Sequence, residues 1–77
     1  HHVYILRCND GTYYTGCTHN MNDRIIRHQK GDVSYTKNRL PIVLVFHCSF
    51  PEKIKAYEFE TYLKSGSGIA FRKKHLI

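Results

Sequence analysis

The sequence predicts an α+β fold, in which a three-stranded antiparallel sheet is flanked by about three helices. Two strand-like segments flank one tight turn near the start of the chain, and a third, strongly apolar segment lies in the middle. Two other segments carry apolar residues at helical spacing, and a short basic segment follows them. With 77 residues, of which 42% are hydrophobic, the chain is expected to form a single domain (residues 1–77) with a thin core.

The first two strands are expected at residues 3–8 and 12–17, joined as a hairpin. Between them, Asn9-Asp10-Gly11 fits a three-residue loop, in which a type I turn is closed by glycine in the left-handed region. Because side chains alternate between the faces of a sheet, this loop places Tyr4 and Tyr14 on the same face. A two-residue turn would shift the register by one residue and send the two phenols to opposite faces.

The first helix can be capped by Asn20 or Asn22 and is expected to run to about Lys30, where a glycine follows as its terminator. At 100° per residue, His28 shares the apolar stripe of this helix and Arg24 borders it. The sequence therefore predicts that both side chains turn toward the interior of the protein.

The rest of the chain divides into five segments. Residues 32–40 have no clear periodicity and are expected to form a basic loop. Residues 42–49 predict the third strand, opened by a proline. Residues 51–64 predict the second helix, and the glycine- and serine-rich residues 65–68 are expected to break it. Residues 69–75 are expected to form a short basic third helix.

The charge of the chain indicates a polyanionic partner. Twelve Lys+Arg against six Asp+Glu give a formal net charge of +6, which favours nucleic acid first and an anionic membrane only second. A basic but merely soluble domain is the alternative. No run approaches the ~18 apolar residues of a membrane span. Three cysteines without a Cys-x-x-Cys pair favour a reducing cytoplasm over a disulfide framework or a structural zinc site.

Five residues carry side chains suited to phosphodiester hydrolysis: Tyr4, Tyr14, Arg24, His28 and Glu60. They supply a proton acceptor, a phosphate clamp and a metal ligand. Each also has a purely structural interpretation. The tyrosines can be packing groups, the histidine a hydrogen-bonded core residue, and the arginine a salt-bridge partner of the glutamate. The glutamate can equally pair with Lys64 at i+4 on its own helix.

Together, these residues resemble the GIY-YIG nucleases, especially the small stand-alone bacterial members. The two signature motifs read His2-Val3-Tyr4 and Tyr14-Thr15-Gly16. The arginine of the family follows the second motif as Arg24, and its histidine comes four residues later as His28. Its metal-binding glutamate, on a helix after an alanine, matches Glu60. The resemblance covers nearly the whole chain and implies the same sheet-and-helix fold.

By resemblance, the reaction is metal-dependent hydrolysis of a DNA phosphodiester. It implies Tyr4 as general base for the attacking water, with Tyr14 orienting the water or sharing this role. Arg24 would stabilise charge on the scissile phosphate, and His28 would assist by hydrogen bonding or proton relay. Glu60 would hold one divalent ion, Mg²⁺ or Mn²⁺, because a lone carboxylate suits an ion that keeps waters and substrate oxygens. Cations near Tyr4 are expected to favour its phenolate form.

The remaining basic residues are expected to contact backbone phosphates, which position DNA without reading its sequence. The candidates are Lys37, Arg39, Arg72, Lys73 and Lys74. Weak sequence preference, or a partner protein for targeting, is expected, because so small a chain has no room for a separate specificity module. The alternative function is a non-catalytic nucleic-acid-binding module on the same scaffold.

The chain departs from the GIY-YIG pattern at three places. His2-Val3 replaces Gly-Ile in the first motif, and Thr15 replaces the usual isoleucine in the second. Many members carry an asparagine about a dozen residues after the glutamate, where this chain reads Phe71-Arg72-Lys73-Lys74. Both motif tyrosines are nevertheless present.

Overall fold

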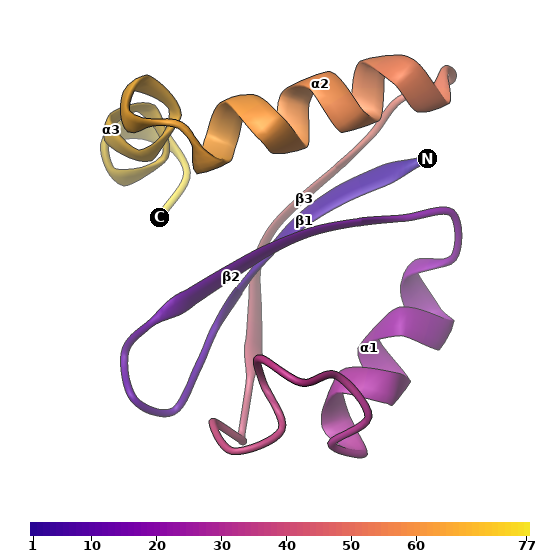
Figure 1. The fold of residues 1–77 in the computed structure, drawn as a ribbon, viewed down its shortest axis with the longest axis vertical. Coiled ribbons are helices and arrows are strands. Elements are labelled where there is room, and N and C mark those ends of the chain that lie inside the picture. Colours follow the sequence, from indigo (N-terminus) through magenta and orange to yellow (C-terminus); the bar gives the residue numbers. More distant parts are fainter.

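The computed structural model describes all 77 residues and confirms the predicted α+β fold (Figure 1). A three-stranded antiparallel sheet is combined with three helices. The elements in chain order are β1 (His2–Arg7), β2 (Tyr13–Thr18), α1 (Met21–Gln29), β3 (Val43–Ser49), α2 (Lys53–Lys64) and α3 (Gly66–His75).

The hairpin has the predicted loop and register. Strand β1 is central in the order β2-β1-β3, so both β2 and β3 are edge strands. Gly11 adopts a left-handed φ of 82°, and its amide donates to the carbonyl of Cys8 at 3.0 Å. Tyr4 consequently lies opposite Gly16, and Tyr4 and Tyr14 project from the same face of the sheet.

The helices cover the sheet from two sides, with α1 on one face and α2 on the other (Figure 1). Between α2 and the sheet, the apolar core is formed by Val3, Ile5, Ala56 and Leu63, which are fully buried. The alternate side chains of β1, including Tyr4, face α1 instead. The two faces therefore separate an apolar core from a face with buried polar groups.

Helix α1 begins as predicted with Asn20, whose Oδ1 accepts a hydrogen bond from the amide of Asp23 at 3.0 Å. The 30–42 segment that follows contains no regular helix or strand. It is nevertheless tied to the hairpin, because the amide of Asn9 donates to the carbonyl of Arg39 at 2.8 Å.

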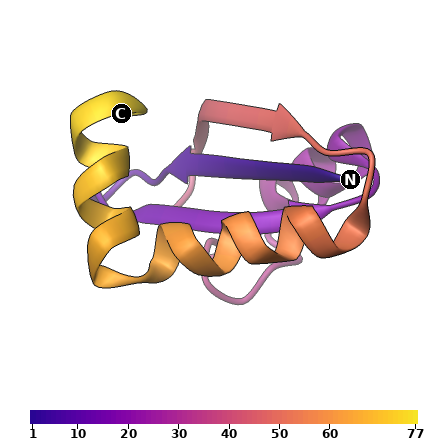
Figure 2. The same ribbon diagram turned by 90° about the horizontal axis from the view of Figure 1, so that it is seen from above.

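The expected break over residues 65–68 is wrong in its extent, because α3 begins already at Gly66. Only Ser65 is extended, and its Oγ caps α3 by accepting from the amide of Gly68 at 3.1 Å. Helix α3 then turns sharply away from α2 (Figure 2). A Cβ at Gly68 would overlap the carbonyl of Tyr62, so a glycine lets the two helices meet this closely. None of the three helices combines the length and the apolar character needed to cross a membrane.

Candidate functional site

Three of the predicted site residues meet on the α1 face of the sheet. The rings of Tyr4 and Tyr14 have centroids 6.1 Å apart, and the His28 ring lies 5.7 Å from the first and 5.0 Å from the second. Tyr4 and His28 are fully buried, whereas Tyr14 is half-buried. Of the two phenols, only that of Tyr14 therefore reaches the surface.

A chain of hydrogen bonds connects this cluster to the loop after α1. The Tyr4 hydroxyl lies 2.9 Å from His28 Nε2, and His28 Nδ1 lies 2.7 Å from the hydroxyl of Thr36. The Thr36 hydroxyl donates to the carbonyl of Val33 at 3.4 Å, so it accepts from Nδ1–H. Nε2 is then left as the acceptor for the Tyr4 proton.

The pKa values of both groups follow from their burial. Burial, followed by the charges of Arg24 and Arg27, lowers the pKa of His28 to about 4, which keeps the imidazole neutral at pH 7. Burial and the neighbouring Tyr14 raise the pKa of Tyr4, although Arg24 opposes them. Arg24 therefore favours the Tyr4 phenolate as expected, but desolvation is the larger effect and keeps the phenol protonated in the free protein.

Gly16 makes room for the Tyr4 ring. A Cβ at position 16 would overlap the hydroxyl and ring carbons of Tyr4. The glycine of the second motif and the tyrosine of the first are thus in direct contact across the hairpin. This contact lets the Tyr4 ring pack against β2 at Gly16 while its hydroxyl reaches Nε2 of His28.

Arg24 lies beside this cluster on α1 and is half-buried. It lines a hollow of about 180 Å³ together with Thr18 of β2 and Lys53 of α2. Its guanidinium forms no ion pair with a carboxylate, because the two ion pairs of the chain join Arg39 to Asp10 and Lys64 to Glu60. The alternative of an Arg24–Glu60 salt bridge is therefore not what the structure forms.

Glu60 lies on α2, on the other side of the sheet from the tyrosines. Its side chain is 18% exposed, and Lys64 Nζ lies 3.1 Å from its Oε2, as the i+4 alternative anticipates. Burial and then the charge of Glu60 raise the pKa of Cys17 on β2, and Arg24 opposes this shift. Both charges therefore act on the same point of β2.

Glu60 is the only acidic residue that the sequence predicts as a metal ligand. Nowhere in the protein do three His, Cys, Asp or Glu side chains converge. Mg²⁺ usually takes one or two carboxylates and completes its shell with waters and substrate phosphate oxygens. The chemistry of Glu60 therefore fits a divalent ion that is shared with a substrate.

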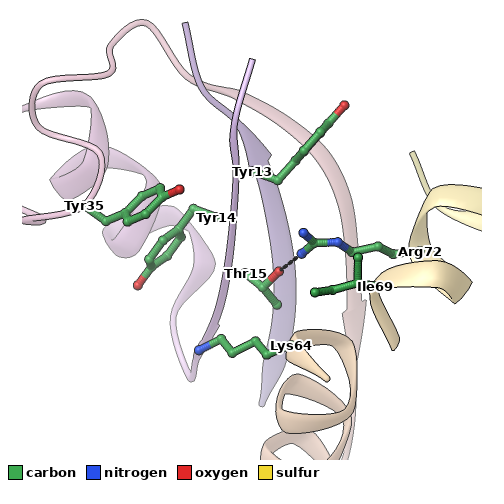
Figure 3. Close-up of a pocket in the computed structure, with 7 residues that line it drawn as sticks. All are labelled: Tyr13, Tyr14, Thr15, Tyr35, Lys64, Ile69 and Arg72. Carbon is green, nitrogen blue, oxygen red and sulfur yellow. Dashed lines mark hydrogen bonds between the residues drawn. The ribbon is translucent and has the colours of Figure 1, made fainter. Parts of the chain in front are cut away.

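A second hollow of about 310 Å³ lies at the other end of the β2 edge (Figure 3). Its lining residues are Tyr13, Tyr14, Thr15, Tyr35, Lys64, Ile69 and Arg72. Arg72 Nη1 donates to Thr15 Oγ1 at 2.9 Å, while Arg72 Nε is buried without a hydrogen-bond partner. Thr15 and Arg72, which lie at two of the places where the chain departs from the GIY-YIG pattern, are thus joined by a hydrogen bond.

The five residues expected to contact DNA phosphates occupy different environments. Lys37, Lys73 and Lys74 are exposed. Arg39 forms an ion pair with Asp10 at 3.0 Å and its guanidinium stacks over Tyr35, 4.2 Å from the ring centroid. Arg72 is half-buried in the second hollow rather than on the open surface. Contacts between any of the five and DNA stay a prediction.

The sequence reasoning missed Thr36 and Tyr35. Both lie in the 30–42 segment, where no periodicity assigns a face to any side chain. Thr36 is fully buried, and Tyr35 packs on Tyr14 with ring centroids 5.5 Å apart. The one available signal was the composition of the segment, since a tyrosine between basic residues is typical of nucleic-acid contacts.

Comparisons with known proteins agree with the family resemblance and with the fold. A family model described as the GIY-YIG catalytic domain matches residues 1–73. Among similar curated proteins, a UPF0213 protein of Halobacterium salinarum is 43% identical over 65 residues, covering 83% of this chain and 84% of that protein. A UPF0213 protein of Staphylococcus epidermidis is 42% identical over 69 residues, with the same coverage. The solution NMR structure of a UPF0213 protein from Bacillus halodurans has a TM-score of 0.61 and 39% identity, covering 96% of this chain and 80% of that chain.

Proposed function

Since the chain belongs to the GIY-YIG nuclease family, we propose that it is an endonuclease that hydrolyses DNA phosphodiester bonds with the help of one divalent metal ion. One observation carries this proposal: the buried hydrogen-bond chain from Tyr4 through His28 to Thr36. A chain of this kind fixes the orientation of the phenols at the site, which simple binding does not require. A cytoplasmic location, expected from the cysteine count, belongs to the same proposal.

Tyr14 would accept the proton of the attacking water. It is the phenol that reaches the surface, and its own hydroxyl proton would leave to solvent. Tyr4 lies behind it, and its hydroxyl donates to Nε2 of His28. Because burial lowers the pKa of His28 to about 4, this imidazole would orient the phenols and would not take up the proton. The resemblance implies Tyr4 as the general base, with Tyr14 orienting the water or sharing this role. We give the contact with the water to Tyr14 instead, because a fully buried Tyr4 cannot touch the water itself.

Arg24 would bind the scissile phosphate. Its guanidinium lies in a hollow without a carboxylate partner, and a planar guanidinium matches phosphate oxygens in a bidentate manner. The charge that develops on the phosphate in the transition state would therefore be stabilised from the α1 side of the β2 edge.

Glu60 would hold the divalent ion, Mg²⁺ or Mn²⁺, on the α2 side of the same edge. When bound, such an ion supplies Lewis-acid stabilisation of the leaving oxygen. To take part, Glu60 would exchange its contact with Lys64 for the ion. The Glu60–Lys64 ion pair is also the one observation that favours the second candidate, a nucleic-acid-binding module without catalysis, because it gives Glu60 a structural role.

Replacement of Glu60 by alanine separates the two candidates. We expect Glu60→Ala to lower cleavage of plasmid and oligonucleotide DNA in Mg²⁺ or Mn²⁺ by at least ~100-fold, because the metal ligand is lost. DNA binding in EDTA, followed by fluorescence anisotropy, should persist or strengthen, since a negative charge leaves a basic surface.

Glu58→Ala is the matched control, because Glu58 lies on the same helix but is exposed. It should cleave DNA at close to the rate of the unmodified protein. Equal losses in both variants would contradict the role of Glu60, and an unmodified protein that binds but never cleaves DNA would favour the binding module.

A further inference from the structure

Of the residues Tyr14, Tyr35, Lys64 and Arg72 that line the second hollow, the mechanism proposed above gives a chemical role to Tyr14 alone. This hollow runs around the edge of β2, with Tyr14 and Tyr35 on one side of the strand and Arg72 on the other (Figure 3). Its volume of about 310 Å³ is at the lower end of the range for small-molecule sites. No acidic side chain lines it.

Two cationic side chains line the hollow on the side of α2 and α3. Lys64 lines it from the end of α2, and its side chain extends toward the side on which Tyr14 lies (Figure 3). Arg72 enters from α3, is held by Thr15 at 2.9 Å, and keeps a buried Nε without a partner. A buried donor without an acceptor costs free energy that a bound anion would recover.

An aromatic surface forms the opposite side. Tyr14 and Tyr35 pack with centroids 5.5 Å apart and an interplanar angle of 37°. Tyr35 lies in a segment without regular structure, yet Arg39 holds it by stacking on its ring and by donating to its carbonyl. Arg39 is in turn fixed by Asp10. The ring is thus preorganised, although it is 37% exposed.

We propose that this hollow binds one unpaired nucleotide of the DNA substrate, with the base against the Tyr14–Tyr35 pair and a phosphate between Lys64 and Arg72. Aromatic rings beside cations are the combination that binds single-stranded nucleic acid without reading its sequence. A base inside a duplex cannot reach the rings, because it is paired and stacked. The inference rests on the proposed nuclease function and adds a preference for DNA with an unpaired nucleotide beside the cleaved bond.

Fluorescence of 2-aminopurine in DNA tests the site without any cleavage. Three oligonucleotides would carry this base in a single strand, in a one-nucleotide bulge and in a fully paired duplex, and would be titrated with the protein in EDTA. We expect stacking to quench the unpaired base in the first two substrates. Tyr35→Ala should abolish the quenching and weaken binding to both by about 5- to 100-fold, with less than a twofold change for the duplex.

Tyr62→Ala is the matched control, because Tyr62 lies on α2 outside this hollow and is similarly exposed, at 40%. It should keep both the quenching and the affinity. Tyr35→Phe retains the ring and should behave like the unmodified protein, which separates loss of stacking from loss of fold. Thermal melts of all variants would confirm that each is folded at the assay temperature.

Two results would overturn the inference. One is equal affinity and equal fluorescence for the paired and unpaired substrates, and the other is full quenching in folded Tyr35→Ala. The nuclease proposal has a separate readout, the Mg²⁺-dependent cleavage that Glu60→Ala removes. Cleavage without base quenching would therefore reject the nucleotide site alone, while absence of cleavage from every substrate would reject the nuclease function on which it rests.

Discussion

Thr36 is buried where the loop after α1 contacts His28 of the tyrosine cluster. Its hydroxyl accepts from Nδ1–H of His28, which fixes the tautomer whose Nε2 faces Tyr4. The motif residues of this network were predictable, because their identities and spacing are visible in the sequence. Thr36 was not, because its role depends on where an irregular loop returns to the sheet.

Thr36→Val should lower the cleavage rate by about tenfold or more, because the isosteric side chain cannot accept the Nδ1 proton and frees the other tautomer. A purely structural role would lower stability only, so the readout is the pH dependence of cleavage together with the tautomer of His28 seen by NMR. Thr36→Ser should restore both. A Thr36→Val protein with an unchanged pH profile and tautomer would contradict this positioning role.

Arg24→Ala should leave stability nearly unchanged, within about 0.5 kcal/mol, because no carboxylate loses its partner. Cleavage should nevertheless fall by about 100-fold or more, since the phosphate loses its clamp. The pKa of His28 should also rise, because Arg24 is the larger of the two charges that lower it. Thermal melts, cleavage assays and NMR titration of His28 would measure the three effects.

Arg27→Ala is the control for loss of charge, since Arg27 is exposed on the same helix. It should raise the pKa of His28 less than Arg24→Ala does and reduce mainly the salt dependence of DNA binding. A large drop in melting temperature for Arg24→Ala, combined with retained cleavage, would defeat the assignment of Arg24 to the phosphate.

At the scale of elements, local chemistry fixed the hairpin but not the junction of α2 and α3. The three-residue loop at Asn9-Asp10-Gly11 determines the register, so the shared face of the two tyrosines followed from turn geometry alone. Residues 65–68 predicted a longer break because two glycines disfavour helix. Packing outweighed that propensity, since Gly68 is needed where α3 approaches Tyr62.

Ser65→Ala should destabilise the fold by about 1 kcal/mol, because the Ser65 hydroxyl both caps α3 and donates to the carbonyl of Tyr62 at 2.6 Å. For a domain of this size, that loss corresponds to a fall in melting temperature of roughly 4–8 °C. Ser67→Ala, at an exposed position within α3, should stay within about 0.5 kcal/mol. Thermal melts would compare the two, and equal shifts would contradict the capping role.

At the scale of the whole molecule, the candidate site is divided between the two faces of one sheet. Tyr14 and Arg24 approach the β2 edge from the α1 side, and Glu60 approaches it from the α2 side. The sequence located Glu60 on the second helix, but it could not show which edge of the sheet that helix meets. Only the tertiary arrangement of α1 and α2 around β2 supplies that information.

Acid should destabilise the protein through His28. The folded pKa of about 4 lies below the usual 6.5, so between these values the unfolded chain binds a proton that the folded chain does not. The contribution of His28 is complete above pH 6.5 and is lost as the pH falls toward 4, by at most about 3 kcal/mol at 1.4 kcal/mol per pKa unit.

Urea unfolding at pH 7.5, 5.5 and 4.5 would measure this loss. His28→Gln should be less stable than the unmodified protein at pH 7.5, yet the difference should shrink as the pH falls, because glutamine has no proton to gain. Parallel stability profiles for the two proteins would show that His28 is not the titrating group.

The contact between Gly16 and the Tyr4 ring also bears on how much information the two signature motifs contain. The Tyr4 ring occupies the space that a side chain at position 16 would need. The tyrosine of the first motif and the glycine of the second are therefore parts of one steric constraint. A sequence search that scores the two motifs as independent therefore overestimates the evidence that they provide together. The same contact makes their loss correlated: once a smaller residue replaces Tyr4, nothing in the hairpin keeps position 16 as glycine. Homologues that have abandoned cleavage should accordingly vary at both positions together, and an alignment in which each varies freely without the other would refute this coupling.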